Sequence, residues 1–480
     1  MEIIALEVAH LDNVCHLVHD GRRALVVDPP RDLRAVEHAA RVAGVEIAVV
    51  ADTHLHHDHL SGALALARRH GADYLLSAEE SVAFERVGTR DGDVLRVGRL
   101  EVEVLATPGH TRHHQAFLVR DPEGGPDALL SGGSLLRGTV GRTDPTSPAA
   151  ARDLAGMQWA GLRVLAGLDP ATRLLPTHGP RSVCAARLPA AADGRRCAGV
   201  GEPSARRDDG TLADELRANP ALRLSRETFV HDLLADPGPL PRQQHRSRSV
   251  AALNRTGAGR APVRTARPAT AAEVSDAVLR GSWVIDLRDR RRFATGHLPG
   301  SISVEHGAGL AAHVGWLVPC EDDLVLLTDS PDRLAEAVHQ LAELGIDAVT
   351  THVVDERRPD AVTLEARCRR ADWRTYALQL DLADATSATP VLVDVRDRAE
   401  FDAGHLPGAV HLPLHEIETR AHELPAGELW VHCRTGQRAG VASSLLQRLG
   451  RVVVHLDDRW ENAAELLLPL EVGAAAGTAA

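Results

Sequence analysis

Apolar and polar positions in the first third of the chain change between strand-like and helix-like periods. Residues 22–28 and 45–51 are mostly apolar and residues 100–105 alternate, which predicts strands. Residues 33–43 and 60–70 carry apolar positions at helical spacing, which predicts amphipathic helices. Strands and helices that follow one another in this way favour an α/β fold, in which ligands bind at the carboxyl ends of strands.

The densest polar cluster lies between the second of these strands and the second helix. Residues 53–59 read Thr-His-Leu-His-His-Asp-His. His54 and His56 are two apart and can point at one centre from an extended loop, while Asp58 and His59 can reach a second position. Imidazole and carboxylate groups are ligands of zinc and iron, so this stretch predicts a metal site.

Two further histidines follow apolar runs downstream. His110 lies in Thr-Pro-Gly-His-Thr, after the strand at 100–105, and His178 lies in Pro-Thr-His-Gly. The alternative interpretation of residues 53–59 is a solvated loop in a chain that has 26 histidines. The recurrence of histidine at strand ends favours the metal site.

These motifs together carry a resemblance to a known family. The order His-x-His-x-Asp-His, Pro-Gly-His, a Gly-Asp-like turn at 131–134 and Pro-Thr-His-Gly resembles the metallo-β-lactamase superfamily, and its persulfide dioxygenase branch in particular. The resemblance covers roughly residues 1–260 and implies an αββα sandwich. It also implies one Fe(II) held by His54, His110 and the aspartate of the Gly-Asp turn, a triad of two histidines and one carboxylate.

The carboxylate of that triad is missing, because Gly133 stands where the family has aspartate. Three outcomes stay open: iron that binds weakly with water in the vacant position, a three-histidine site that includes His56 and resembles hydrolytic zinc enzymes, or a metal-free scaffold. The resemblance makes Asp58, His59 and His178 ligands of a second site or hydrogen-bond partners that orient the first ligands. We expect Gly133→Asp to raise the iron content.

The rest of the first domain carries weaker signals. Cys184 follows the Pro-Thr-His-Gly motif, and we expect a buried structural cysteine, with contact to a thiol substrate as the alternative. Residues 186–210 predict a mobile surface insertion. Short helices are predicted at 212–219 and 228–234, and residues 250–255 are expected to close the domain.

The second half of the chain repeats itself. Residues 284–300 and 392–408 share Asp-x-Arg-Asp-Arg, a phenylalanine and Gly-His-Leu-Pro-Gly without a gap, which indicates two copies of one domain. The shared motif resembles rhodanese, the sulfurtransferase fold, in which this stretch is mainly structural. His297 and His405 are therefore expected to pack and hydrogen-bond rather than to catalyse.

Cys433 is the clearest candidate nucleophile. It lies between a predicted strand at 429–432 and a predicted helix at 439–449. The free N–H groups and positive dipole at the start of a helix favour a thiolate, and Arg434 and Arg438 are expected to add to this effect. The sequence Cys-Arg-x-Gly-x-Arg after a strand resembles the rhodanese active loop, which holds a persulfide or a sulfur oxyanion. A buried cysteine in a strand-to-helix turn is the alternative.

The middle copy lacks this nucleophile. Thr328 falls at the position of Cys433, and Cys320 lies before the strand and cannot substitute for it. We therefore predict an α/β protein of three domains: an αββα sandwich at 1–262, a degenerate rhodanese-like domain at 265–362 that serves as a spacer or docking module, and an active rhodanese-like domain with a parallel sheet, like the middle one, at 372–475.

Composition limits the class of protein. The chain has 480 residues, too many for one ordinary core, and a formal net charge of −12, which argues against nucleic acid as the main partner. The first residues lack the basic and apolar regions of a signal peptide, and no run is long enough to span a bilayer. Six widely scattered cysteines favour a reducing cytoplasm over a disulfide framework.

The order of the three domains resembles bacterial persulfide dioxygenase–sulfurtransferase fusions. The resemblance implies sulfide detoxification, in which a glutathione-like or other low-molecular-weight thiol persulfide is oxidised at Fe(II), and sulfur is exchanged with sulfite or thiosulfate at Cys433. The alternatives are a zinc-dependent thioester hydrolase of the glyoxalase II type fused to a rhodanese, and a metal-free N-terminal scaffold that serves the transferase. A homo-oligomer is compatible with the sequence.

Overall fold

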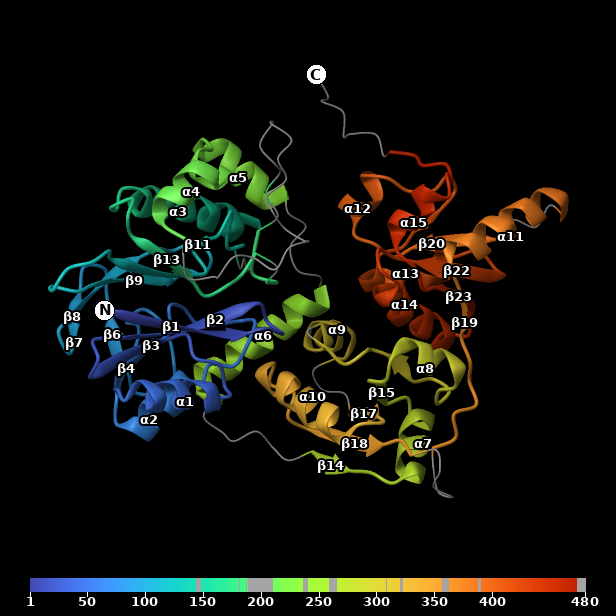
Figure 1. Cartoon of the computed structure of the whole chain (residues 1–480), viewed down its shortest axis with the longest axis horizontal. Helices are drawn as coiled ribbons and strands as arrows, with labels where there is room; N and C mark the ends of the chain where they lie inside the picture. The colour runs from blue at the N-terminus through green and yellow to red at the C-terminus, as the bar shows by residue number, and fades with distance from the viewer. Residues whose placement is uncertain are drawn as a thin grey trace. The chain divides into compact units, whose positions relative to one another are not determined.

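The structure is a computed structural model of the chain (Figure 1), and the residues it describes fall into two compact units. The described residues are 1–143, 148–180, 182–186, 188, 210–235, 241–258, 266–307, 309–319, 323–355, 362–386 and 390–472. The first unit is Met1–Val263 with His339–Ile346, and the second is Arg264–Val338 with Asp347–Ala480. The units do not separate the two repeated domains, so the domain boundaries given by the sequence stay predictions.

Two sheets form the centre of the first unit. One has the order β1 (Glu2–Val8), β2 (Asn13–His19), β3 (Arg23–Val27), β4 (Glu46–Ala51), β5 (Asp73–Ser77) and β6 (Val87–Thr89). The other has the order β13 (Arg173–Pro176), β10 (Ala128–Gly132), β9 (Gln115–Arg120), β8 (Leu100–Ala106) and β7 (Val94–Val97), and β11 (Leu135–Leu136) pairs with β12 (Thr139–Val140). Buried side chains from both sheets, such as Leu25 and Phe117, form one core cluster, so the sheets pack face to face.

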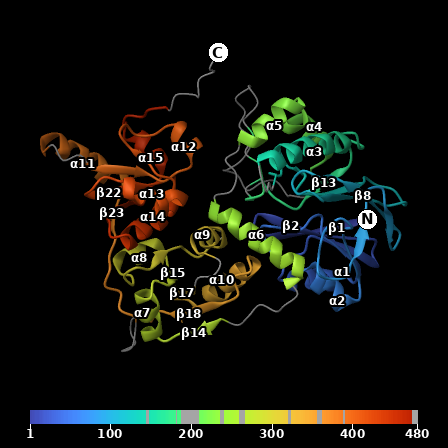
Figure 2. The same ribbon diagram turned by 180° about the vertical axis from the view of Figure 1, so that it is seen from behind.

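Helices cover the outer faces of both sheets (Figures 1 and 2). The helices are α1 (Arg34–Ala43), α2 (Ala63–His70), α3 (Pro148–Ala166), α4 (Leu212–Ala218), the short 3₁₀ turn η1 (Pro220–Leu222), α5 (Arg226–Ala235) and α6 (Pro241–Thr256). Helices α1 and α2 lie on the first sheet, and α3, α4 and α5 lie on the second. This arrangement confirms the predicted αββα sandwich.

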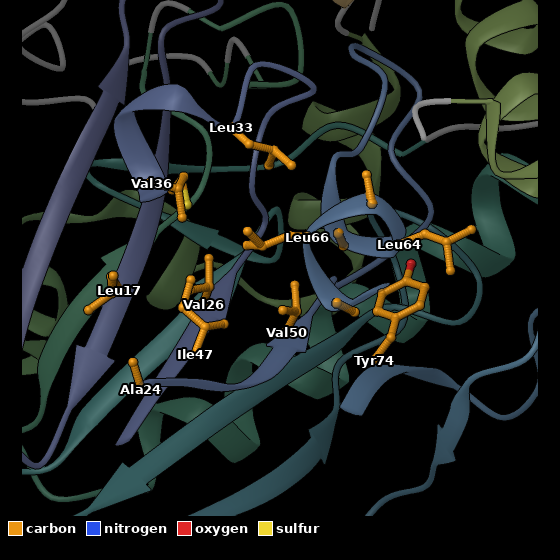
Figure 3. Packing of buried hydrophobic residues seen from close by; sticks show 14 of the residues in the cluster. Leu17, Ala24, Val26, Leu33, Val36, Ile47, Val50, Leu64, Leu66 and Tyr74 are labelled. Atoms are coloured by element: carbon orange, nitrogen blue, oxygen red, sulfur yellow. The ribbon is translucent and has the colours of Figure 1, made fainter. Parts of the chain in front are cut away.

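The first sheet and its helices show how the local pattern produces the layers. Val36 and Ala40 of α1, four residues apart, are both buried, and Gly44 ends the helix with a φ of 68°. Figure 3 shows Val36 and Leu66 packed above Val26 and Val50 of the sheet. The predicted strands and helices agree with the structure apart from their ends, and most of the predicted insertion at 186–210 lies outside the described residues.

The second unit contains two sheets with the same strand order. The middle copy has β14 (Arg267–Pro268), β18 (Val349–Val353), β17 (Leu324–Thr328), β15 (Trp283–Asp286) and β16 (Ile302–Ser303). The C-terminal copy has β19 (Arg369–Ala371), β23 (Val452–Leu456), β22 (Glu428–His432), β20 (Val391–Asp394) and β21 (Val410–His411). All pairings in both sheets are parallel, as expected from the sequence.

The helices of the two repeated domains also follow the repeat. In the middle copy they are α7 (Ala271–Leu279), α8 (Arg290–Thr295), α9 (Leu310–Leu317) and α10 (Pro331–Glu343). In the C-terminal copy they are α11 (Trp373–Thr386), α12 (Arg398–Asp402), η3 (Leu414–Glu416), α13 (Ile417–Arg420), η4 (Ala421–Glu423), α14 (Gln437–Arg448) and α15 (Trp460–Glu465). Helix α10 follows β17, and α14 follows β22, so each copy has one strand–loop–helix at the same place (Figure 2).

The repeated motif is structural in both copies. His297 Nδ1 donates to the carbonyl of Phe293 at 2.9 Å and the two rings stack at 3.8 Å. His405 Nδ1 donates to the carbonyl of Phe401 at 3.0 Å with the same ring separation. These contacts confirm the packing and hydrogen-bonding role expected for both histidines. Within the described part of the chain, no helix combines the length and the apolar character needed to cross a bilayer.

Candidate functional site

Asp28, directly after β3, connects three strand ends at one edge of the sandwich. Its carboxylate accepts hydrogen bonds from the backbone N–H of Thr53 at 2.7 Å, from Thr53 Oγ1 at 2.8 Å and from Thr177 Oγ1. Asp28 has a φ of 52°, a left-handed value that non-glycine residues rarely adopt. Burial raises the pKa of Asp28, but the charge of His56 and these hydrogen bonds outweigh it and hold the pKa below its usual range.

His56 is turned toward carboxylates. Its Nε2 lies 3.1 Å from Asp28 Oδ1 and 3.7 Å from Asp52 Oδ1. Burial lowers the pKa of His56, but the charges of Asp28, Asp52 and Asp58 together raise it to about 9. The Nε2 of His56 thus faces carboxylates, while the ring also belongs to the candidate ligand group His54–His56–His178, so its part as a possible third metal ligand stays a prediction.

In His54 and His110 the hydrogen-bonded ring nitrogen is Nδ1, whereas in His56 it is Nε2. Thr53 Oγ1 donates to Asp28, so its oxygen accepts from His54 Nδ1 at 2.9 Å. His110 Nδ1 donates to the backbone carbonyl of Arg142 at 2.5 Å. A proton on Nδ1 leaves the lone pair of each ring on Nε2, the tautomer of a metal-ligating histidine.

His178 has the same arrangement through an amide. Asn13 Nδ2 donates to Asp58 Oδ2 at 2.7 Å, which directs its amide oxygen toward His178 Nδ1 at 2.9 Å. Asp58 also lies 3.1 Å from His59 Nδ1. Asp58, His59 and His178 are thus joined in one hydrogen-bonded group through Asn13. Their role as ligands of a second site or as partners that orient the first ligands stays a prediction.

These three histidines leave buried lone pairs without partners. Nε2 of His54, of His110 and of His178 has no hydrogen-bond partner, although each side chain is fully buried. Burial and neighbouring histidines hold the pKa of His54 and His110 well below its ordinary value, and burial lowers that of His178 to about 4. Buried polar atoms are normally satisfied, so neutral imidazoles with free Nε2 atoms fit a metal ion.

Among the described residues, the ligand atoms fall into overlapping groups. His54, His57 and His110 form one, and His110, His178 and Cys184 form another. The remaining groups all include His56: His54–His56–His178, His56–Asp58–His59 and Asp28–Asp52–His56. The structure thus brings the predicted pair His54 and His110 together, with ring centroids 4.8 Å apart, but completes that group with His57 rather than His56.

The turn at 131–134 has no room for the missing carboxylate. Gly132 has a φ of 57°, and Gly133 N–H donates to His114 Nε2 at 2.9 Å. A Cβ added to Gly133 would lie 2.2 Å from Cδ2 of His110 and 2.6 Å from its Nε2. The side chain of His110 therefore occupies the space beside position 133.

Asn254 is a positioning residue that the sequence did not single out. Its Nδ2 donates to the carbonyls of His56 at 2.8 Å and His59 at 2.9 Å, and its Oδ1 accepts from Ser61 N–H at 3.0 Å. It comes from α6, almost two hundred residues away along the chain. The sequence pointed to this segment only through the expectation that residues 250–255 close the domain.

The second candidate site is the loop between β22 and α14. Gly436 precedes α14 with a φ of 84°, and the N–H of Ala439 in the first turn donates to Cys433 Sγ at 3.3 Å. The thiol thus lies at the start of the helix, as the sequence predicts. The side chain of Cys433 is 0% exposed, while the neighbouring Arg434 and Thr435 are exposed. This burial is what the alternative interpretation, a buried cysteine in a strand-to-helix turn, also expects.

Both arginines of the loop face carboxylates. Arg438 donates to Glu400 at 2.6 and 2.9 Å, and Arg434 lies 3.4 Å from Glu461. Burial lowers the pKa of Arg438, but the hydrogen bonds and charge of Glu400, with the charge of Cys433, outweigh it and raise the pKa above its usual value. The charge of Arg438 therefore interacts with Cys433 while Glu400 neutralises part of that charge.

The corresponding loop of the middle copy differs at the positions of Cys433, Arg434 and Gly436 and keeps an arginine, Arg333, at the position of Arg438. Thr328 ends β17 fully buried, in the place of Cys433. Asp329 follows it and pairs with Arg292, and Arg333 lies 3.9 Å from the same carboxylate. Pro331 begins α10, so the left-handed glycine of the other copy is also missing.

Comparison with known proteins identifies the class. The model of the metallo-beta-lactamase superfamily matches residues 10–178, and that of the rhodanese-like domain matches residues 270–354 and 378–465. A metallo-beta-lactamase structure from Staphylococcus aureus covers 74% of this chain and 99% of its own, with a TM-score of 0.62 and 22% identity, which shows the fold. The chain belongs to the metallo-beta-lactamase superfamily through its N-terminal domain, which is joined to two rhodanese-like domains.

Two relatives of the N-terminal domain are named hydroxyacylglutathione hydrolase, and a solved structure is named ETHE1. Hydroxyacylglutathione hydrolase of Albidiferax ferrireducens is 34% identical over 178 residues, 37% of this chain and 66% of the relative. That of Acidiphilium cryptum is 33% identical over 235 residues, 46% of this chain and 89% of the relative. The structure of ETHE1 from Myxococcus xanthus is 27% identical and covers 54% of this chain and 100% of its own, with a TM-score of 0.41.

Proposed function

We propose that the C-terminal rhodanese domain transfers sulfane sulfur through Cys433, and that the N-terminal domain is a metal-dependent enzyme that oxidises a low-molecular-weight thiol persulfide. The observation that carries the first half is the placement of Cys433 Sγ at the first turn of α14, with Ala439 N–H 3.3 Å away. A helix N-terminus stabilises the thiolate and then the persulfide, both of which are anions.

The transfer at Cys433 is a thiolate exchange. The thiolate attacks the outer sulfur of thiosulfate, an S–S bond forms on Cys433, the S–S bond of thiosulfate breaks, and sulfite leaves with the electron pair. The loop that holds Arg434 and Thr435 admits the oxyanion, and Ala439 N–H holds the anionic sulfur. Arg438, fixed by Glu400, supplies positive charge beside the sulfur.

In the N-terminal domain, His54 and His110 would hold the metal ion through the Nε2 atoms that have no hydrogen-bond partner. Bound iron would supply oxygen activation, in the overall reaction RSSH + O2 + H2O → RSH + SO3²⁻ + 2H⁺. Thr53, Arg142 and Asn13 hold the Nδ1 protons, which keeps the rings in the ligating tautomer. Sulfite from this reaction is an acceptor for sulfur on Cys433, which gives thiosulfate.

A second candidate for the N-terminal domain is hydrolysis of a hydroxyacylglutathione thioester with zinc. It is favoured by the 33% identity with a hydroxyacylglutathione hydrolase, 89% of which this chain covers. It requires a water activated by the metal, and the residues that orient the histidines are the same in both reactions. Metal identity and substrate separate the two.

Two measurements test these proposals. Protein purified without oxygen and incubated with thiosulfate should gain the mass of one sulfur atom, and Cys433→Ser should not; an unmodified wild-type protein would refute sulfur transfer. The same preparation, loaded with iron, should consume oxygen when glutathione persulfide is added, whereas His110→Ala should not. Release of thiol from a hydroxyacylglutathione without oxygen consumption would establish the hydrolase instead.

A further inference from the structure

The N-terminal metal site lacks an anion from the expected turn, and the nearby carboxylates are engaged elsewhere. Asp28 binds Thr53, Thr177 and His56, and Asp58 binds Asn13 and His59. Among the described residues, neither carboxylate belongs to a ligand group that contains His110. A divalent ion held by neutral imidazoles alone would keep its full charge in a buried site, which is costly.

Cys184 is a donor that can ionise to a thiolate, and the structure places it beside His110. Its Sγ and one nitrogen each of His110 and His178 all lie within 4.8 Å of one another, and all three side chains are buried. Two ligand atoms of one tetrahedral zinc ion are about 3.3–3.6 Å apart. These three atoms therefore reach a common ion after shifts of roughly 1 Å.

The histidines of this group are prepared for a ligand independently of the cysteine. Nε2 of His110 and Nε2 of His178 are both buried and have no hydrogen-bond partner, while both Nδ1 atoms are held by oxygen acceptors. An unpaired buried nitrogen costs free energy unless something binds it. A ligand between these two rings would also face the sulfur of Cys184.

The backbone fixes Cys184 relative to His110. Arg142 N–H donates to the carbonyl of Cys184 at 2.7 Å, and the carbonyl of Arg142 accepts from His110 Nδ1 at 2.5 Å. Ser182 Oγ accepts from Cys184 N–H at 3.2 Å, and His57 Nε2 lies 3.6 Å from Sγ. The backbone of Arg142 thus links Cys184 to His110, and His57 contacts the sulfur.

We propose that Cys184 supplies the anionic ligand that position 133 cannot, so that its thiolate, His110 and His178 hold a divalent metal ion. Thiolate and imidazole together suit zinc and iron(II). The proposed function places His54 and His110 at the metal ion, and this inference goes beyond it by adding Cys184 and His178 as ligands. It holds for oxidation and hydrolysis alike. It does not involve Cys433.

The test uses the full chain, stripped of metal without oxygen and titrated with Co²⁺. Wild-type protein should develop a near-ultraviolet charge-transfer band from thiolate to cobalt. Cys184→Ser should lose this band, and Cys15→Ala, which alters another buried cysteine of the same domain, should keep it. A full band in Cys184→Ser, or a wild-type protein that binds cobalt without a band, would overturn the assignment.

Zinc affinity gives a second readout, and a circular dichroism spectrum recorded beside it separates loss of a ligand from loss of the fold. Cys184→Ser should bind Zn²⁺ at least about tenfold more weakly than wild type, with an unchanged circular dichroism spectrum. Cys184→Asp restores an anion and should recover part of that affinity without the cobalt band. Equal affinity in the wild type and in folded Cys184→Ser would show that the thiol is structural.

Gly133→Asp separates this assignment from the family pattern. The sequence alone leads to the expectation that it raises the iron content. In the structure its Cβ would lie 2.2 Å from Cδ2 of His110, so the new carboxylate displaces a ligand of the proposed site. We now expect metal content to fall. A rise in iron content would show that position 133 has room for a ligand, and would overturn the premise that Cys184 supplies the anion in its place.

Discussion

The two rhodanese-like domains have one scaffold and two different loops. Their sheets share the strand order, and each places a loop between a central strand and the next helix. In the C-terminal copy the loop begins with Cys433 and bends at Gly436, with a φ of 84°. In the middle copy Thr328 and Asp329 occupy the first two positions and Pro331 begins the helix. The comparison separates the residues that build the domain from those that give it chemistry.

The shared residues include a buried ion pair in the same place. Arg288 binds Asp286 through two nitrogens, at 3.0 and 2.6 Å, and Arg396 binds Asp394 at the same distances. Each arginine also donates to the carbonyl of a glycine eight residues further on. The middle copy thus has the structural contacts of the C-terminal copy, with Thr328 in place of its cysteine.

The largest effect is expected for Cys433→Ser, which removes the nucleophile from the active copy. Sulfur transfer from thiosulfate to cyanide should fall to background, since the described residues offer no other thiol at a helix N-terminus. Steady-state rates of sulfite release measure this. The matched control is Cys368→Ser, which alters a buried cysteine directly before β19 and whose rate should stay near wild type. Residual transfer by folded Cys433→Ser would show that another residue carries the sulfur.

The second prediction concerns the shared ion pair. Arg396→Ala and Arg288→Ala each leave a buried carboxylate without its partner, and each should lower the free energy of unfolding by about 3–5 kcal/mol. Urea denaturation, with hydrogen exchange to locate the affected copy, measures both. Arg398→Ala, which breaks the exposed pair with Asp402, should change stability by about 1 kcal/mol or less. A large difference between the first two variants would contradict the view that the copies share a scaffold.

Agreement between sequence and structure was best where a local pattern decides the outcome. Hydrophobic periods located strands and helices, and the repeated Asp-x-Arg and Gly-His-Leu-Pro-Gly motifs located the two copies, because these residues contact near neighbours along the chain. The tautomers of His54 and His110 depend on Thr53 and Arg142, of which Arg142 is distant in sequence. Such contacts form only after the sheets have packed.

The features that the sequence did not reveal all come from contacts between distant segments. His56 turns toward Asp28 because a separate strand brings that carboxylate near. Cys184 meets His57 across a sequence separation of 127 residues, and Asn254 reaches the histidine loop from a distant helix. Burial of Cys433 likewise depends on how its loop folds over the sulfur. None of these contacts leaves a periodic signal along the chain.

A smaller effect is expected for Gly436→Ala, which tests the bend of the active loop. A Cβ there would lie 2.5 Å from Oδ1 of Asp457, in a left-handed conformation that costs alanine about 1–2 kcal/mol. The loop should shift, and sulfur transfer should fall by about 10²-fold. Gly408→Ala is the control, since Gly408 has a φ of 75° with nothing within 4 Å. It should lose stability but keep its rate; equal loss of rate in both would show that strain alone is responsible.

The smallest effect is expected for Thr328→Cys, which places a thiol at the matching position of the middle copy. In the Cys433→Ser background this variant should still show no sulfur transfer, because the residue after the new cysteine is the acidic Asp329, where the active copy has Arg434, and a negative charge opposes a thiolate. Pro331 also replaces the left-handed glycine that wraps the loop. Rates of sulfite release and intact mass after thiosulfate treatment measure the outcome.

A variant that carries the complete active loop in the middle copy sharpens the comparison of the two copies. The variant adds to Thr328→Cys the substitutions Asp329→Arg, Ser330→Thr, Pro331→Gly and Asp332→Gln, and Arg333 already matches Arg438. If the scaffold is truly shared, this variant should form a detectable persulfide where the single substitution forms none. Transfer by Thr328→Cys alone would mean that the strand-to-helix position is sufficient for reactivity. Failure of the complete loop in a folded protein would mean that contacts outside it, such as that of Glu400 with Arg438, are also required.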